Sequence, residues 1–174
     1  NLPGVPQPQY IMHEKIEPTG KTNPILAAAM TTGDNLCIGA KIHSVVSEGM
    51  KDNISNTLID GSLDTRYQAS RSSNMYKMAG ISNEVVIDLG SKKTFDTYTL
   101  VGHATKDTQV AKSFEILVSS DGSNYTAVDY QPENTKATVS VTFDEVSARY
   151  VKIRLYEPDS NKTGVTRLSE FMLF

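Results

Sequence analysis

The sequence predicts an all-β domain, an antiparallel sandwich, from three observations. Apolar and polar residues alternate with a period of two in several short runs, turn residues separate these runs, and no segment carries a sustained helical period. A period of two places one face of a strand in a core and the other face in water. At 174 residues the chain is long enough for one well-filled domain with an extension.

The first part of the chain, residues 1–34, differs from the rest. Its first nine residues hold three prolines, which prevent both a helix and a central strand. Proline and glycine recur up to Pro24, and the apolar run 25–30 predicts a short helical turn. We therefore expect residues 1–34 to form a proline-containing linker or N-terminal extension, and residues 35–174 to form the sandwich.

Strands are expected from residue 42 onward. The first covers residues 42–47, and the next is a compact apolar run, 84–90, that Gly90 closes. Residues 114–119 alternate, and Asp121-Gly122 makes the turn into a strand at 125–128. Alternation then resumes at 139–143 and at 151–155, which are expected to be two further strands.

Composition excludes several function classes. The net charge is −3 and the isoelectric point is about 5.6, so the chain lacks the basic face that nucleic acid or anionic lipid requires. No apolar run is long enough to span a bilayer. A single cysteine, Cys37, allows no intrachain disulfide, which indicates a bacterial or cytosolic origin; we interpret it as a small buried hydrophobe in a strand.

Motifs for catalysis are missing from the sequence. It contains no G-x-S-x-G, H-E-x-x-H or C-x-x-C motif and no phosphate-binding loop, and its three histidines have no metal-ligand spacing. We therefore expect a binding domain and not an enzyme. The start at Asn1, without an initiator methionine, is consistent with a piece of a larger protein or a mature chain whose leader was removed.

Six stretches resemble, in the same order, the discoidin or coagulation factor 5/8 (F5/8) type C family. They are residues 35–41, 58–67, 86–90, 114–125, 149–154 and 168–173. The fourth is similar to the family's F-x-I-x-x-S-x-D-G-x-x-W segment, although Tyr125, like Tyr67 earlier, stands where tryptophan is usual. The resemblance implies a galactose-binding-like jelly-roll β-sandwich, nearest to the bacterial family 32 carbohydrate-binding modules.

The segment Asp60-Gly61-Ser62-Leu63-Asp64-Thr65 is a candidate cation site. Ca²⁺ takes six to eight oxygen ligands that mix carboxylates with backbone carbonyls, and a tight turn with glycine can point several carbonyls inward. The resemblance implies a structural Ca²⁺ that ties this loop to the last strand. Its ligands would be Thr57, Asp60, Ser62, Thr65, Ser169 and Glu170. Two alternatives stay open: Na⁺ in place of Ca²⁺, and a plain Asp-Gly turn that binds no metal.

Three loops are candidates for ligand binding. Sugar recognition needs an apolar plane against the ring and a few fixed polar groups. The candidate plane is Tyr76, and the candidate polar groups are Arg71, His103 and Asn161. By resemblance, the expected ligands are galactose or N-acetylgalactosamine termini of a glycan. Membrane docking through Met75, Tyr76 and Met78 is disfavoured by the net negative charge.

Taken together, the sequence predicts a non-catalytic carbohydrate-binding module. We expect it to belong, with other domains of a larger parent chain, to a secreted or cell-surface bacterial protein, on the outer surface or in the periplasm. The alternative is a structural or protein–protein interaction domain of the same fold without a working sugar site.

Overall fold

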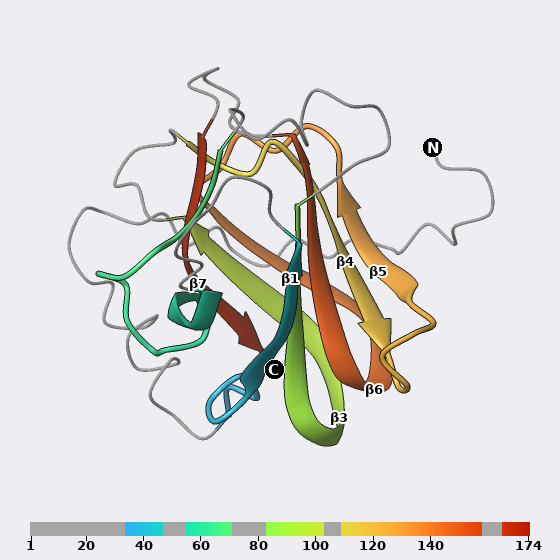
Figure 1. The fold of residues 1–174 in the computed structure, drawn as a ribbon. Coiled ribbons are helices and arrows are strands. Elements are labelled where there is room, and N and C mark those ends of the chain that lie inside the picture. Colours follow the sequence, from blue (N-terminus) through green and yellow to red (C-terminus); the bar gives the residue numbers. More distant parts are fainter. Residues whose placement is uncertain (1–33, 47–54, 71–82, 103–108, 158–164) are drawn as a thin grey trace.

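The computed structural model describes residues 34–46, 55–70, 83–102, 109–157 and 165–174 (Figure 1). Within these residues, the elements are strands apart from one short 3-10 helix. They are β1 (Lys41–Val46), η1 (Ser55–Leu58), β2 (Tyr67–Ser70), β3 (Asn83–Gly102), β4 (Ser113–Ser119), β5 (Thr126–Gln131), β6 (Thr138–Glu157) and β7 (Val165–Leu173). In this described part of the chain, no helix has the length and apolarity needed to cross a membrane.

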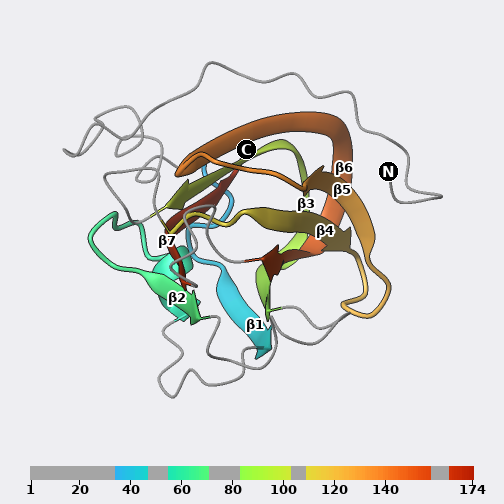
Figure 2. The same ribbon diagram turned by 90° about the horizontal axis from the view of Figure 1, so that it is seen from above.

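The strand pairings in the described part of the chain are all antiparallel, and the two long strands β3 and β6 belong to both layers of a sandwich. The hydrogen-bonded order is β2-β7-β3-β6-β4-β5, with β1 also pairing with β3. The first half of β3 and the second half of β6 form one layer with β1, β4 and β5. The other halves form the second layer with β7 and β2. Figure 2 shows β6 curving from one layer into the other. The predicted antiparallel sandwich is confirmed.

The bend that joins the layers corrects two of the expected strand boundaries. Gly90 does not close a strand, because β3 continues to Gly102. Instead Gly90 has φ +82°, a conformation that favours glycine, and the register of β3 against β6 shifts between Asp88 and Lys93. The runs 139–143 and 151–155, expected as separate strands, are the two halves of β6. Local alternation cannot distinguish a bent strand from two short ones.

The core lies between the two layers around Tyr98. Its ring stacks on Phe171 at 5.9 Å and meets Phe114 edge-on at 6.5 Å. Its buried hydroxyl donates a hydrogen bond to the carboxylate of Asp129. Cys37 belongs to this core, as expected of a small buried hydrophobe, but it lies in a turn and not in a strand. Burial raises the pKa of its thiol well above the usual range.

Strand β4 departs from the expected pattern of one wet face. Every residue from Ser113 to Ser119 is buried, including Glu115. The carboxylate of Glu115 accepts hydrogen bonds from Tyr156 and Arg154, so its charge is compensated on the outer face of the sheet. The alternation of apolar and polar residues therefore predicted correctly which side chains of β4 face the core. It did not predict that the side chains on the outer face are buried as well.

Candidate functional site

The strand ends that flank the candidate binding loops lie together at one end of the sandwich. Ser70 pairs with Val165, and Gly102 pairs with Leu168. On the other layer, Asn83 pairs with Leu155 two residues before β6 ends. The connections 71–82, 103–108 and 158–164 therefore all leave from and return to this end, which we call the loop end. The bend of β3 and β6 marks the opposite end (Figure 1).

The four predicted sugar contacts, Arg71, Tyr76, His103 and Asn161, lie outside the described residues, as do Met75 and Met78. The structure thus describes where the three loops are attached and not how their side chains are arranged. The attachment points are brought together across long sequence separations by the register of β2, β3, β6 and β7.

The predicted cation loop is described in full, and it folds against the last strand. Asp60 organises the turn: one of its carboxylate oxygens accepts from the amide of Ser62 at 2.9 Å, and the other from the hydroxyl of Thr65 at 2.6 Å. Glu170 on β7 accepts from the amide of Gly61 at 3.1 Å. Residues 109 positions apart are therefore joined by this contact.

The carboxyl groups of Asp60 and Glu170 face each other in this loop. Glu170 is buried, and burial together with the nearby charge of Asp60 and a hydrogen bond between the two carboxyl groups raises its pKa to about 9. The amide of Gly61 opposes this shift. A buried carboxyl group, that of Glu170, held beside the exposed one of Asp60 is an arrangement that a bound cation stabilises.

Further oxygens of the predicted ligand set surround this pair. The hydroxyl of Ser169 donates to the carbonyl of Leu63 at 3.2 Å, and Thr65 Oγ1 lies 3.3 Å from the carbonyl of Ser62. Thr57 is buried in η1, which contacts β7. Among the described residues no three His, Cys, Asp or Glu side chains come together, so a cation here would depend on hydroxyl and carbonyl oxygens beside two carboxylates. The chemistry of this set fits Ca²⁺.

Comparison with known families and structures identifies the fold family. The family model described as F5/8 type C domain matches residues 43–171. The chain belongs to the F5/8 type C family. The comparison with curated proteins gives no match.

Several solved structures with the same fold are described as carbohydrate-binding modules. The F5/8 type C domain is similar to CpGH89CBM32-5 from Clostridium perfringens, in complex with GalNAc-β-1,3-galactose, with a TM-score of 0.64, 18% identity and coverage of 80% of this chain and 99% of that one. Chitosan-binding module 1 of a Paenibacillus sp. IK-5 chitosanase/glucanase matches with a TM-score of 0.63 and 21% identity, and the match covers 80% of this chain and 98% of that one. The family 32 carbohydrate-binding module of Streptococcus pneumoniae EndoD matches with a TM-score of 0.66 and 12% identity, and the match covers 80% of this chain and 98% of that one. The predicted similarity to family 32 modules is confirmed.

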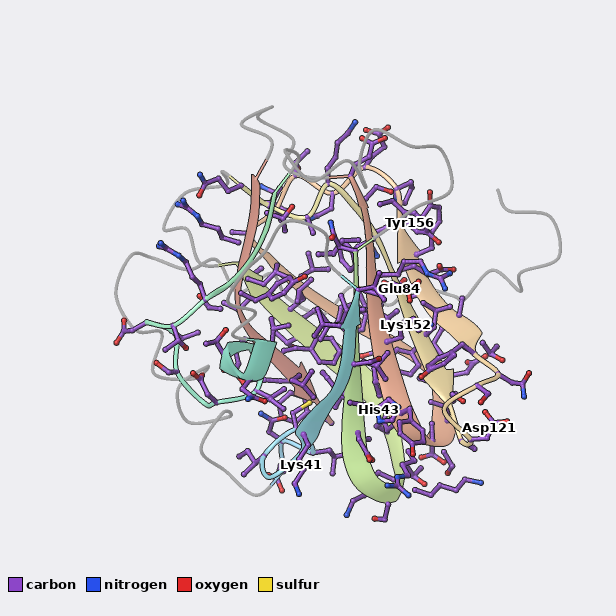
Figure 3. All side chains as sticks on the ribbon, in the orientation of Figure 1. Lys41, His43, Glu84, Asp121, Lys152 and Tyr156 are labelled. Atoms are coloured by element: carbon purple, nitrogen blue, oxygen red, sulfur yellow. The ribbon has the colours of Figure 1, made fainter. Side chains whose placement is uncertain are left out.

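The outer face of the first layer carries a charged network that sequence patterns did not reveal. Arg154 on β6 bridges two carboxylates, with Nε 2.7 Å from Glu84 and Nη1 3.3 Å from Glu115. Tyr156 donates to Glu115 at 2.6 Å, and Lys152 lies 3.3 Å from Glu84. Figure 3 shows Glu84, Lys152 and Tyr156 along one face of the F5/8 type C domain. The partners come from β3, β4 and β6, which explains why the network has no local sequence signal.

Aromatic rings border this network. The Lys152 ammonium lies 3.9 Å from the ring centroid of Tyr125, and Tyr130 meets Tyr156 edge-on at 6.1 Å. Burial alone would raise the pKa of Glu84, but Arg154 and Lys152 outweigh it and hold that pKa below its usual value. By contrast, the pKa values of the Tyr125 and Tyr156 hydroxyls are raised, mainly through burial.

Proposed function

We propose that this F5/8 type C domain is a non-catalytic carbohydrate-binding module whose loop end holds a terminal sugar. The observation that carries the proposal is the convergence of three strand connections at the loop end. The sequence places Arg71, Tyr76, His103 and Asn161 on these connections. Loops on a rigid sandwich are where a ligand site can be built without disturbing a core.

The expected ligand is a glycan with a galactose or N-acetylgalactosamine terminus. Support comes from the family 32 module of Clostridium perfringens, which is in complex with GalNAc-β-1,3-galactose. In the proposed site the ring of Tyr76 stacks on the sugar, and His103, Arg71 and Asn161 bond its hydroxyls. The module would serve a secreted or cell-surface bacterial protein, holding its parent chain near glycans and so raising the local concentration of a neighbouring domain.

A structural Ca²⁺ beside the loop end is part of this proposal. Asp60 and Glu170 would supply the carboxylates, and Thr57, Ser62, Thr65 and Ser169 the hydroxyl or carbonyl oxygens. The ion would clamp the loop before β2 onto β7 and would take no part in chemistry.

A glycan array probed with the full chain tests the proposal, followed by calorimetric titration of the glycans that bind. We expect affinities of about micromolar to millimolar for a shallow single site. His103→Ala should weaken binding roughly 10- to 100-fold through the loss of a hydrogen-bond partner. His43→Ala is the matched control, because His43 is an exposed histidine on β1, and it should bind like the unaltered chain. Binding to no glycan, or equal loss in both variants, would favour a structural or protein-interaction role instead.

A further inference from the structure

A pocket of about 510 Å³ lies at the bend end of the sandwich, where β3 and β6 pass from one layer into the other. The turn between β4 and β5 forms one wall, and residues 146–148 in the bend of β6 form the other. Figure 3 shows Asp121 on that turn, well separated from Tyr156 near the loop end. The lining residues all belong to the described part of the chain. The pocket is therefore separate from the three connections on which sugar contacts were predicted.

The floor of the pocket is apolar and belongs to the core. Val118, Val128 and Ala148 are members of the core cluster, and Val146 packs against it. Val118 and Val128 are each 8% exposed, whereas Ile116 on the same face of β4 is 0% exposed. The two layers thus leave aliphatic core side chains partly accessible at this end. A ligand with an aliphatic group on this floor would remove apolar surface from water, which is favourable.

The rim of the pocket is polar and carries one charged side chain, that of Asp121. Its Oδ1 accepts from the amides of Ser123 and Asn124, both at 2.8 Å, and from the Ser119 hydroxyl at 2.9 Å. Among the described residues, its Oδ2 accepts only from the Asn124 side chain, at 2.8 Å. A carboxylate oxygen can accept two hydrogen bonds, so Oδ2 has room for a donor from a ligand.

The charges around the pocket favour a cation. Hydrogen bonds, mainly from Asn124, hold the pKa of Asp121 well below its usual range, so its carboxylate stays charged at neutral pH. Two further exposed carboxylates, Asp144 and Glu145, directly precede the bend residues 146–148. Among the described residues that line the pocket there is no lysine, arginine or histidine.

Two cationic residues flank the bend without lining the pocket. Arg149 follows the lining residue Ala148, and it pairs with Asp88 at 2.8 Å. Lys93 is aligned with Ala148 in the strand register, but it is exposed and is not a lining residue. The charge of Asp121 is therefore not compensated from within the lining.

We propose that this pocket binds a primary ammonium group carried on a short aliphatic chain. The ammonium would donate to Oδ2 of Asp121 and to the serine hydroxyls of the rim, and the methylenes would lie on the valine floor. A carboxylate ligand would meet a like charge, and a neutral alcohol would lack the ionic contact. Free alkylamines and the lysine side chain of a polypeptide share this chemistry. The inference is independent of sugar binding at the loop end.

Titration of the ¹⁵N-labelled full chain with n-butylammonium chloride tests the proposal. We expect amide shifts in residues 118–128 and 146–148, little change in residues 165–174, and a Kd on the order of millimolar. Each methylene removed, from butyl to propyl to ethyl, should weaken binding about fourfold, because each contributes buried apolar surface. 1-Butanol should bind about threefold more weakly than n-butylammonium, and butyrate should not bind.

A charge-removing variant tests the role of Asp121. Asp121→Asn keeps the shape of the side chain, so it should weaken n-butylammonium binding about threefold and leave 1-butanol binding unchanged. Asp64→Asn is the matched control, because Asp64 is an exposed aspartate of another turn that does not line the pocket. It should bind both compounds like the unaltered chain.

Nα-acetyl-lysine methylamide distinguishes the two sources of the ligand. Binding as tight as that of n-butylammonium would assign the pocket to a lysine side chain of a polypeptide, and much weaker binding would assign it to free amines. Three results would overturn the proposal: shifts that avoid the pocket, equal binding of butyrate, or equal affinity in Asp121→Asn and Asp64→Asn. Should Asp121→Asn fail to fold, the charge is tested in the unaltered chain, where added salt should weaken the binding of n-butylammonium but not that of 1-butanol.

Discussion

Single residues at the cation loop join parts of the chain that are far apart in sequence. Asp60 organises its own turn, while Glu170 reaches that turn from the last strand and is buried there with a raised pKa. The local motif around Asp60 was recognisable because its spacing is short and fixed. The burial of Glu115 could not be recognised from the sequence, because its partner Arg154 is 39 positions away and the alternation of apolar and polar residues carries information only about residues close in sequence.

Removing the cation should destabilise the domain. We expect a chelator to lower the melting temperature and added Ca²⁺ to restore it, with a stabilisation of about 3 kcal/mol at a hundredfold excess over Kd. Asp60→Ala should abolish this response while the β spectrum is kept. Asp64→Ala is the control, since Asp64 lies in the same loop but its carboxylate is not in the proposed ligand set. Thermal melting measures both, and a melting temperature indifferent to chelator and Ca²⁺ would contradict the cation site.

Two glycines with positive φ allow the cost of a strained backbone to be separated from the cost of a steric contact. Gly90 and Gly122 have φ of +82° and +76°, so alanine costs about 1–2 kcal/mol at either position. A Cβ at Gly90 meets open space, whereas one at Gly122 lies 3.2 Å from the ring of Tyr150. That ring is held by an edge contact with His43 at 5.1 Å. We expect urea unfolding to give a larger loss for Gly122→Ala than for Gly90→Ala; an equal or smaller loss would show that the Tyr150 ring moves freely.

At the scale of elements, β3 and β6 hold the sandwich together by running through both layers. Sequence patterns located their apolar faces correctly, but they did not show that each is one strand, because the bend depends on tertiary pairing around Gly90 and Asp88. Asp88 accepts from the amide of Gly90 at 2.8 Å and pairs with Arg149 on β6. Charged side chains thus form contacts at the bend, through Asp88 and Arg149, and on the outer face of the first layer, through Arg154 and its two carboxylate partners.

The two arginines of β6 should differ in their contribution to stability. Arg154→Ala leaves the buried carboxylate of Glu115 without its cation, which costs about 3 kcal/mol. Arg149→Ala should cost clearly less than Arg154→Ala, because a largely solvated pair contributes little, and the Arg149 side chain is 42% exposed. Urea unfolding of both variants measures the difference. Equal costs would mean that burial does not set the strength of these pairs.

Acid should weaken the bend through Asp88. The hydrogen bond from Arg149 is the main reason that the pKa of Asp88 falls to about 2 in the folded chain, below its ordinary value of 3.8. A lowered folded pKa contributes stability above pH 4 that is lost as the pH falls from 4 to 2. Solvent screening limits this contribution to about 1 kcal/mol. Urea unfolding at several pH values should show a larger acid loss for the unaltered chain than for Asp88→Asn. Parallel pH curves would contradict the assignment.

At the scale of the whole molecule, the family fold separates two ends with different roles. The bend end is built from tight turns such as the Asp121-Gly122 turn, and the loop end gathers the connections on which sugar contacts were predicted. The motifs in the sequence were sufficient to predict the family, because each combines turn chemistry with core positions of this fold. The arrangement of the binding side chains does not follow from such motifs, since loops vary while the core stays the same.

Mapping of backbone amide shifts during a sugar titration tests the central claim most directly. The full chain, labelled with ¹⁵N, would be titrated with galactose and with N-acetylgalactosamine. We predict shifts concentrated in residues 71–82, 103–108 and 158–164, with little change in residues 89–93 and 120–124 at the bend end. Millimolar sugar that leaves the three loops unmoved, or shifts that gather at the bend end, would contradict a carbohydrate-binding loop end.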